Sequence, residues 1–94
     1  MKSIYKVPNG KLLKVFLELN ENKISKLILT GDFFAHPEEG IHAIEDELLG
    51  NELSENRNEL IDKINESVQK NNIELFGLSP EAIAEAIYLA KNGG

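Results

Sequence analysis

The first third of the chain alternates hydrophobic and polar residues, which is the pattern of β-strands with one covered face. The alternating segments are residues 2–7, 11–19 and 23–30. Asn9-Gly10 and Asn20-Glu21-Asn22 separate them, and residues of these types accept the backbone conformations of tight turns. The sequence therefore predicts a three-stranded antiparallel meander.

Period two divides the side chains of the second and third strands between two faces. The predicted core face carries Leu13, Val15, Leu17, Leu19, Ser25, Leu27 and Leu29. The other face mixes apolar and charged side chains: Leu12, Lys14, Phe16, Glu18, Ile24, Lys26, Ile28 and Thr30. Two interpretations of this mixed face stay open, because either a helix covers part of it or it is a docking surface for another chain.

Helical periodicity replaces the alternation in the rest of the chain. Pro37 suits the first position of a helix that runs to about Leu49, where Gly50 can end it. Ser54 is the predicted N-cap of a second helix that ends near Asn71. This second helix has a polar outer face, so we expect it on the outside of the molecule.

A short extended segment and a third helix complete the pattern. Residues 73–76 are predicted to form an edge strand or a connector, and Ser79-Pro80 begin a helix with an alanine-rich face. That face consists of Ala82, Ile83, Ala86, Ile87 and Ala90. The order β-β-β-α-α-(β)-α, with strands first and helices after, predicts an α+β two-layer sandwich in a single domain, residues 1–94.

Composition narrows the function classes. The chain has no cysteine, which excludes a disulfide framework, a thiolate zinc site, a cysteine-ligated iron–sulfur cluster and a cysteine nucleophile. The first residues lack the apolar region of a signal peptide, and no apolar run approaches the roughly 20 residues of a membrane span. We therefore expect a cytoplasmic protein with no membrane partner.

The net charge of −6 is unevenly distributed. Residues 1–30 hold six lysines and two glutamates, whereas residues 31–94 hold four basic and fourteen acidic residues. The acidic total argues against nucleic-acid binding, which needs cationic contacts to phosphate. The lysines either keep the strand surfaces soluble and blunt the sheet edges, which is the simpler interpretation, or meet a small anion or an acidic protein patch.

Two groups of residues are candidates for a functional site. Asp32, His36, Glu39 and His42 are of the types that bind divalent metals. Turn, helix-start and surface roles explain these residues more simply, so we predict no metal site. The adjacent pair Phe33-Phe34 either lines a pocket or fills the seam between the sheet and the first helix, and we favour the seam.

Three strings of the sequence stand out: Lys6-Val7-Pro8-Asn9-Gly10-Lys11-Leu12, Thr30-Gly31-Asp32-Phe33-Phe34 and His36-Pro37-Glu38-Glu39. Together they resemble the accessory domain of lipoate–protein ligases. The resemblance extends to Gly77-Leu78-Ser79-Pro80-Glu81, and Gly-Asp-Phe-Phe is its specific part. It implies a fold similar to that of iron–sulfur scaffold proteins, whose cluster-binding cysteines this chain lacks.

The resemblance implies a role beside a larger protein. Ligases of this family use ATP and Mg²⁺ to activate lipoate as lipoyl-AMP, and then transfer the lipoyl group to a lysine of an acceptor domain. Their lipoate and ATP sites belong to a catalytic domain that this chain does not contain. The resemblance therefore implies the separate-subunit form, non-catalytic alone, in a heterodimer with a catalytic subunit; the alternative is a piece of a longer ligase. The chain by itself is expected to bind no cofactor, and ATP, Mg²⁺ and lipoate are expected in the complex.

The resemblance also carries over particular positions. The residues expected at the partner interface or in support of adenylation are Lys11, Gly31, Asp32, Phe33, Phe34 and His36. Contact of Lys11 with phosphate is a hypothesis motivated by the anion in lipoyl-AMP. The competing class is a stand-alone interaction or regulatory module of the same fold. An autonomous metal-dependent enzyme built on Asp32 and His36 is a more distant alternative.

Overall fold

A computed structural model describes residues 1–93 of the chain. Its elements, in order, are β1 (Lys2–Lys6), β2 (Leu12–Asn20), β3 (Lys23–Gly31), β4 (Phe34–His36), α1 (Gly40–Leu48), α2 (Arg57–Lys70), β5 (Glu74–Phe76) and α3 (Pro80–Gly93). β1, β2 and β3 form an antiparallel sheet in that order, while β4 and β5 form a separate antiparallel pair. The predicted meander is confirmed.

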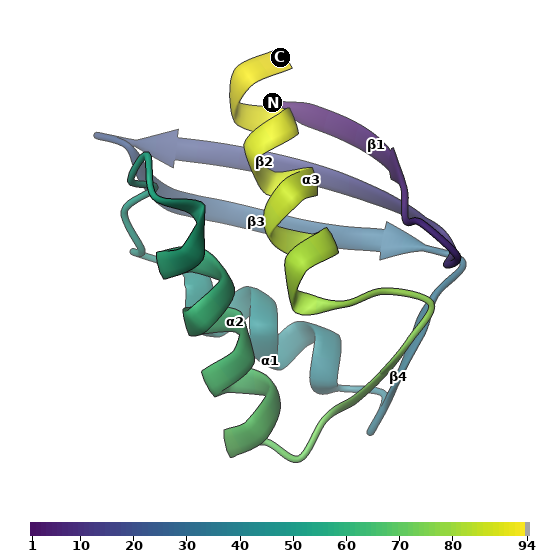
Figure 1. Ribbon diagram of the computed structural model, residues 1–94. Helices are drawn as coiled ribbons and strands as arrows, with labels where there is room; N and C mark the ends of the chain where they lie inside the picture. Colours follow the sequence, from purple (N-terminus) through teal and green to yellow (C-terminus); the bar gives the residue numbers. More distant parts are fainter. Residues whose placement is uncertain (94) are drawn as a thin grey trace.

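The helices lie on one side of the three-stranded sheet (Figure 1). α3 packs against β1 and β2, α1 packs against β3, and α2 packs outside against both of these helices. This arrangement confirms the α+β two-layer prediction, including the outer position of the second helix. No helix among residues 1–93 is long and apolar enough to cross a membrane.

The core lies between the sheet and the helices. β2 and β3 contribute the fully or nearly fully buried Leu13, Val15, Leu17, Leu27 and Leu29, as the alternation predicted. The whole predicted face of α3 is also buried, namely Ala82, Ile83, Ala86, Ile87 and Ala90. Within residues 1–93 no helix packs on the opposite face of the sheet, so the interpretation that a helix covers part of this face is wrong.

Ile24 was assigned to the wrong face. Leu17 pairs with Leu27 and Glu18 with Lys26, but Leu19 pairs with Ile24, so a β-bulge leaves Ser25 as an extra residue. Because Ser25 is an extra residue, the side chains that precede it in β3 point to the opposite face from the one that strict alternation predicts. Ile24 therefore enters the core, with 1% of its surface exposed, and Ser25 is exposed.

The start predicted for the first helix was also wrong. Pro37 does not begin α1, because residues 34–36 form β4 and pair with β5. The amide of Gly40 then donates to the carbonyl of Pro37 at 2.9 Å, which closes a turn before the helix. Strand pairing between distant segments thus overrides a local helix-start signal. The predicted end is confirmed, since Gly50 has φ 84° just beyond the helix.

Ser54 does not cap α2 as predicted. The N-cap is Asn56, whose side chain accepts a hydrogen bond from the amide of Asn58 at 3.0 Å. The Ser54 hydroxyl instead donates to the carboxylate of Glu59 at 2.7 Å. The cap of α3 is as predicted, because the Ser79 hydroxyl accepts from the Ala82 amide at 3.1 Å.

Candidate functional site

The turn between β1 and β2 is tied to the end of β3. The carboxylate of Asp32 accepts a hydrogen bond from the amide of Leu12 at 2.9 Å. The turn itself is closed by the Gly10 amide on the Val7 carbonyl at 2.9 Å, with Asn9 at φ 56°. Lys11 and Asp32, predicted to belong to one surface, are therefore brought close together by the hydrogen bond from the Leu12 amide to the Asp32 side chain.

Gly77 is a third member of this site that the sequence pattern did not connect to Lys11. The Lys11 amide donates to the Gly77 carbonyl at 2.8 Å. Gly77 has φ 89°, and a Cβ there would lie 2.4 Å from Cγ of Lys11. Only glycine fits this approach. The family resemblance at residues 77–81 includes Gly77, but it does not indicate which residue lies beside Gly77 in the fold.

Gly31 is held in a similar close approach. Its φ is 154°, and a Cβ would lie 2.1 Å from the Leu12 carbonyl oxygen and 2.9 Å from the ring of Phe33. We call Lys11, Leu12, Gly31, Asp32, Phe33 and Gly77 the junction. Its geometry requires glycine at two positions and fixes the direction in which the chain leaves β3 toward β4.

The two adjacent phenylalanines have different environments. Phe33 is partly buried and packs against the core, as the seam interpretation predicted. Phe34 is 63% exposed, so the seam interpretation is wrong for this residue. Its ring stacks on that of Phe76, with 4.7 Å between ring centroids and 14° between planes. Pairing of β4 with β5 places Phe34 and Phe76 opposite each other.

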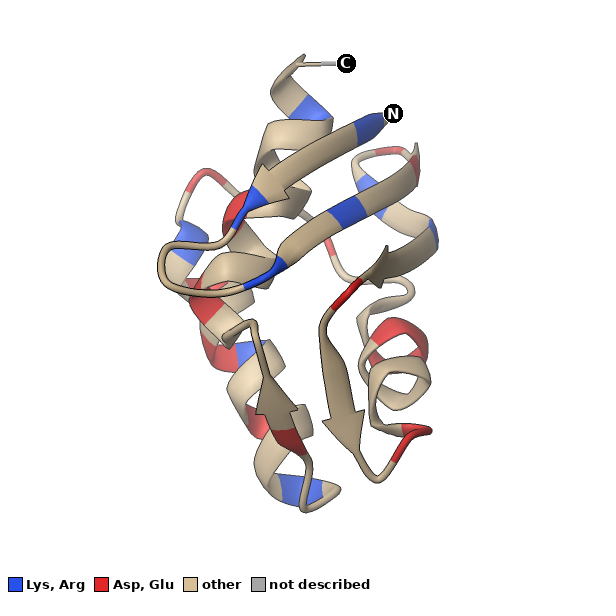
Figure 2. Cartoon of the chain, turned by 90° about the vertical axis from the view of Figure 1, so that its right-hand side faces the viewer, with Lys and Arg blue, Asp and Glu red and all other residues tan. Residues whose placement is uncertain are grey.

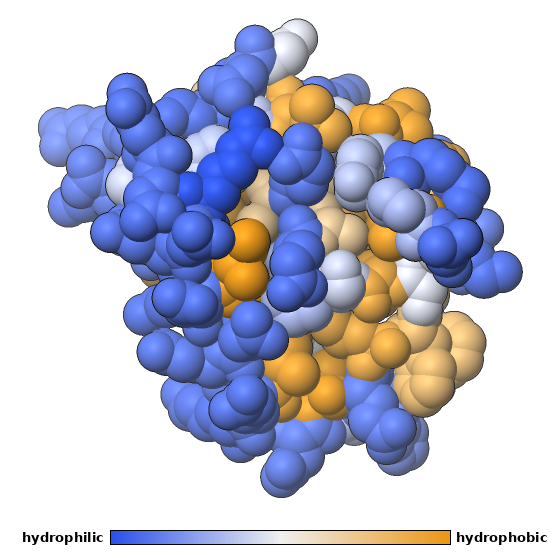
Figure 3. Space-filling model, viewed as in Figure 1, coloured by the Kyte–Doolittle hydropathy of each residue, from blue (hydrophilic) through white to orange (hydrophobic). Residues whose placement is uncertain are grey.

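An open hollow of about 420 Å³ lies beside the exposed ring of Phe34. Its lining comes from the end of β3, the start of β4 and the first part of α1: Leu29, Thr30, Gly31, Phe33, Phe34, Ala35, Glu38, Ile41 and His42. Figure 3 shows apolar residues gathered at the lower right of the molecule, around the segment that carries β4 in Figure 1. The site therefore offers an apolar surface held on a rigid frame.

The histidines do not join Asp32. His36 is exposed at the far end of β4, where it pairs in register with Glu74. His42 Nδ1 lies 2.9 Å from Oε1 of Glu45, whose Oε2 accepts from the Leu29 amide at 2.7 Å. Within residues 1–93, no group of three or more His, Cys, Asp or Glu side chains is placed to hold a metal ion. Glu45 thus has a structural role, linking α1 to β3.

Comparison with known proteins bears on what such a surface does. No protein-family model matches the sequence. The chain is 32% identical over 79 residues to lipoate-protein ligase A subunit 2 of Thermoplasma acidophilum, which covers 81% of this chain and 76% of that protein.

A solved structure of an archaeal lipoylation system gives a second match. It describes a bipartite lipoate protein ligase and its E2 lipoyl domain from Thermoplasma acidophilum. The TM-score is 0.70 at 29% sequence identity, over 93% of this chain and 97% of the matched chain. Sequence and fold therefore agree, and the chain belongs to the lipoate–protein ligase A subunit 2 family.

Proposed function

We propose that the chain is the accessory subunit of a two-chain lipoate–protein ligase. In this role it supports the ATP-dependent activation of lipoate to lipoyl-AMP by a catalytic subunit, before transfer to a lysine of an acceptor domain. The observation that carries the proposal is the similarity to a protein named as subunit 2 and to a chain of a bipartite ligase, over most of both lengths.

The subunit acts by ordering the catalytic subunit and not by supplying reacting groups. ATP, Mg²⁺ and lipoate bind in the complex, at a site that the catalytic subunit provides. The junction supports such a role because its hydrogen bonds and its two close-packed glycines fix a rigid surface. Binding a rigid surface can complete a partner's active site at low entropic cost.

Phe34 is the residue best placed to contact the catalytic subunit. Its stacked partner Phe76 is itself 40% exposed, so the pair offers apolar area that a second protein can cover. Exposed aromatic side chains held in one orientation are typical anchors of protein interfaces. Gly31 lies against the ring of Phe33, and the Asp32 carboxylate ties this segment to β2. Lys11 and His36 are exposed.

The test is lipoate-dependent exchange of pyrophosphate into ATP by the matching catalytic subunit, with and without this chain. We expect exchange only when both chains are present. Phe34→Ala should lower the exchange rate about tenfold at equal concentrations, since it removes the anchor. Leu89→Ala is the matched control, because Leu89 is an exposed apolar residue on α3, away from the junction, and should leave the rate unchanged.

Exchange by the catalytic subunit alone, unaffected by this chain, would refute the proposal. The competing function, a stand-alone interaction module with a different partner, would then be favoured. Equal rates with the Phe34 and Leu89 variants would retain the accessory role but move the contact away from the aromatic pair.

A further inference from the structure

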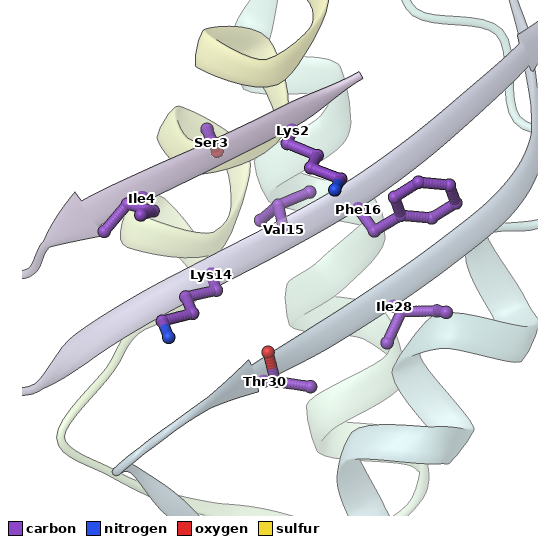
Figure 4. Close-up of a pocket in the computed structure, with 8 residues that line it drawn as sticks. All are labelled: Lys2, Ser3, Ile4, Lys14, Val15, Phe16, Ile28 and Thr30. Atoms are coloured by element: carbon purple, nitrogen blue, oxygen red, sulfur yellow. The ribbon is translucent and has the colours of Figure 1, made fainter.

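The sheet has a second exposed apolar cluster, on the side away from the helices. We call this side the outer face; its side chains are Lys2, Ile4, Lys6, Leu12, Lys14, Phe16, Glu18, Lys26, Ile28 and Thr30. Ile4, Phe16 and Ile28 come from three neighbouring strands and line one open hollow of about 540 Å³ (Figure 4). Ile4 is 68% exposed and Ile28 is 40% exposed. A contiguous apolar patch of this kind is typical of an association surface.

The charge of the outer face is opposite to that of the whole chain. It carries four lysines and one glutamate, although the chain has a net charge of −6. Figure 2 shows lysines along the strands of the sheet and acidic residues mostly along the helices and loops. Acidic residues therefore cluster on other surfaces, and the outer face is a local cationic region.

The lysines lie among the apolar side chains and not apart from them. Lys26 Nζ is 5.5 Å from the ring centroid of Phe16, at cation–π distance. Lys2 pairs in register with Phe16, and Lys14 pairs with both Ile4 and Thr30. A complementary surface must therefore combine apolar groups with carboxylates at matching positions.

We propose that the outer face is the docking surface for the catalytic subunit, which meets it with an apolar centre rimmed by carboxylates. This inference rests on the proposed function and specifies which surface provides the affinity. Apolar contact with Ile4, Phe16 and Ile28 supplies the buried area, and the lysines provide orientation and a faster encounter.

Charge argues against two other occupants. A second copy docked by a two-fold axis would bring the lysines of one outer face against those of the other, which is unfavourable. A nucleic acid would leave the apolar side chains without a matching contact, and the net negative charge of the chain opposes its approach.

The outer face and the hollow beside Phe34 adjoin at Thr30, which lines both hollows. Docking through the outer face therefore places Phe34 beside the same partner. The two surfaces should have separable effects: the outer face provides most of the affinity between the subunits, and Phe34 sets the exchange rate of the complex once formed.

The experiment titrates this chain into the catalytic subunit, measuring Kd by calorimetry and exchange rate at each concentration. Lys14→Glu should weaken binding about tenfold by replacing attraction with repulsion, while excess subunit restores the full exchange rate. Lys63→Glu is the matched control, since Lys63 is exposed on α2, outside the outer face, and should change Kd less than twofold. Higher salt should weaken binding of the wild type more than that of Lys14→Glu.

Ile28→Ser tests the apolar part without changing charge, and thermal unfolding checks that each variant is folded. Weaker binding by folded Lys14→Glu and Ile28→Ser supports the inference. Wild-type affinity in both variants, with the wild type binding and stimulating exchange, overturns the inference but leaves the proposed function intact. A free chain that dimerises in solution, with the dimer lost in Ile28→Ser, overturns the choice of occupant. A wild type that neither binds nor stimulates the catalytic subunit overturns both proposals.

Discussion

The two faces of the three-stranded sheet differ in how much of their apolar surface is buried. On the covered face, Leu13, Val15 and Leu17 of β2 are at most 2% exposed, because they lie on the side of the sheet where α3 packs against β2. On the outer face, Ile4 is 68% exposed and Ile28 is 40% exposed. Burial of apolar area drives folding, so the covered face accounts for stability. The outer face keeps apolar area available for another molecule.

The largest expected effect comes from truncating one leucine on the covered face. Leu17→Ala should lower the free energy of unfolding by about 2–5 kcal/mol, because Leu17 is fully buried and its loss leaves a cavity. Ile28→Ala, a truncation of similar size on the outer face, should cost less than about 1 kcal/mol. Urea denaturation of both variants measures the difference, and equal losses would show that the outer face is part of the core.

Glu45 hydrogen-bonds to the edge strand β3, and its removal should have the next largest effect on the free energy of unfolding. This buried carboxylate accepts the Leu29 amide at 2.7 Å, on the side of β3 away from β2. Glu45→Ala leaves that amide without an acceptor and should cost about 1–3 kcal/mol. Glu45→Gln keeps an oxygen acceptor and should lose less, as measured by urea denaturation.

Asp46→Ala is the control for the Glu45 variants, since Asp46 is the adjacent, exposed residue on α1. The same free energy of unfolding for Glu45→Ala and Asp46→Ala would show that the Leu29 amide finds another partner. None of these three variants should change Kd for the catalytic subunit, because Glu45 and Asp46 lie on the helical side of the sheet.

The contrast between the two faces was largely predictable from sequence. Alternation in β2 is sufficient to assign Leu13, Val15 and Leu17 to the core. Ile24 could not be assigned correctly, because a bulge depends on the pairing between two strands and not on the sequence of either one. The choice between a covered and an open outer face likewise depended on where the helices pack.

Several residues that the structure brings together were singled out from the sequence, but their arrangement was not. The resemblance selected Lys11, Gly31 and Asp32, which hydrogen bonds and close packing bring together. It did not predict that Phe33 and Phe34 point to different environments or that Phe34 stacks on Phe76. That stack depends on pairing between segments some forty residues apart, which local patterns do not specify.

The smallest expected effect concerns a carboxylate that clamps the helical layer. Glu47 of α1 accepts hydrogen bonds from Ser67 Oγ at 2.7 Å and Lys70 Nζ at 3.0 Å, both on α2, and from Nδ2 of the C-cap residue Asn71 at 2.6 Å. The Ser67 hydroxyl foremost, followed by Lys70 and Asn71, holds the pKa of Glu47 below its ordinary value. The unfolded chain therefore takes up this proton at a higher pH than the folded chain.

The lowered pKa of Glu47 makes the stability of the folded chain depend on pH. The stabilisation from Glu47 is fully present above the ordinary glutamate pKa and is lost as pH falls through the lowered pKa of the folded state. Wild type should therefore be more stable than Glu47→Gln at pH 7, by a modest amount because Glu47 is partly exposed, and this advantage should shrink on acidification. Urea denaturation of both proteins between neutral and acidic pH measures the change.

Glu66→Gln provides the control, because Glu66 is an exposed carboxylate on α2. A stability difference between wild type and Glu47→Gln that stays constant across the acidic range would show that the contribution of Glu47 does not depend on its negative charge. Because Glu47 connects helices on the covered side, Glu47→Gln should also bind the catalytic subunit with wild-type Kd at neutral pH. A weakened Kd in this variant would mean that the helical layer, and not the outer face alone, contacts the partner.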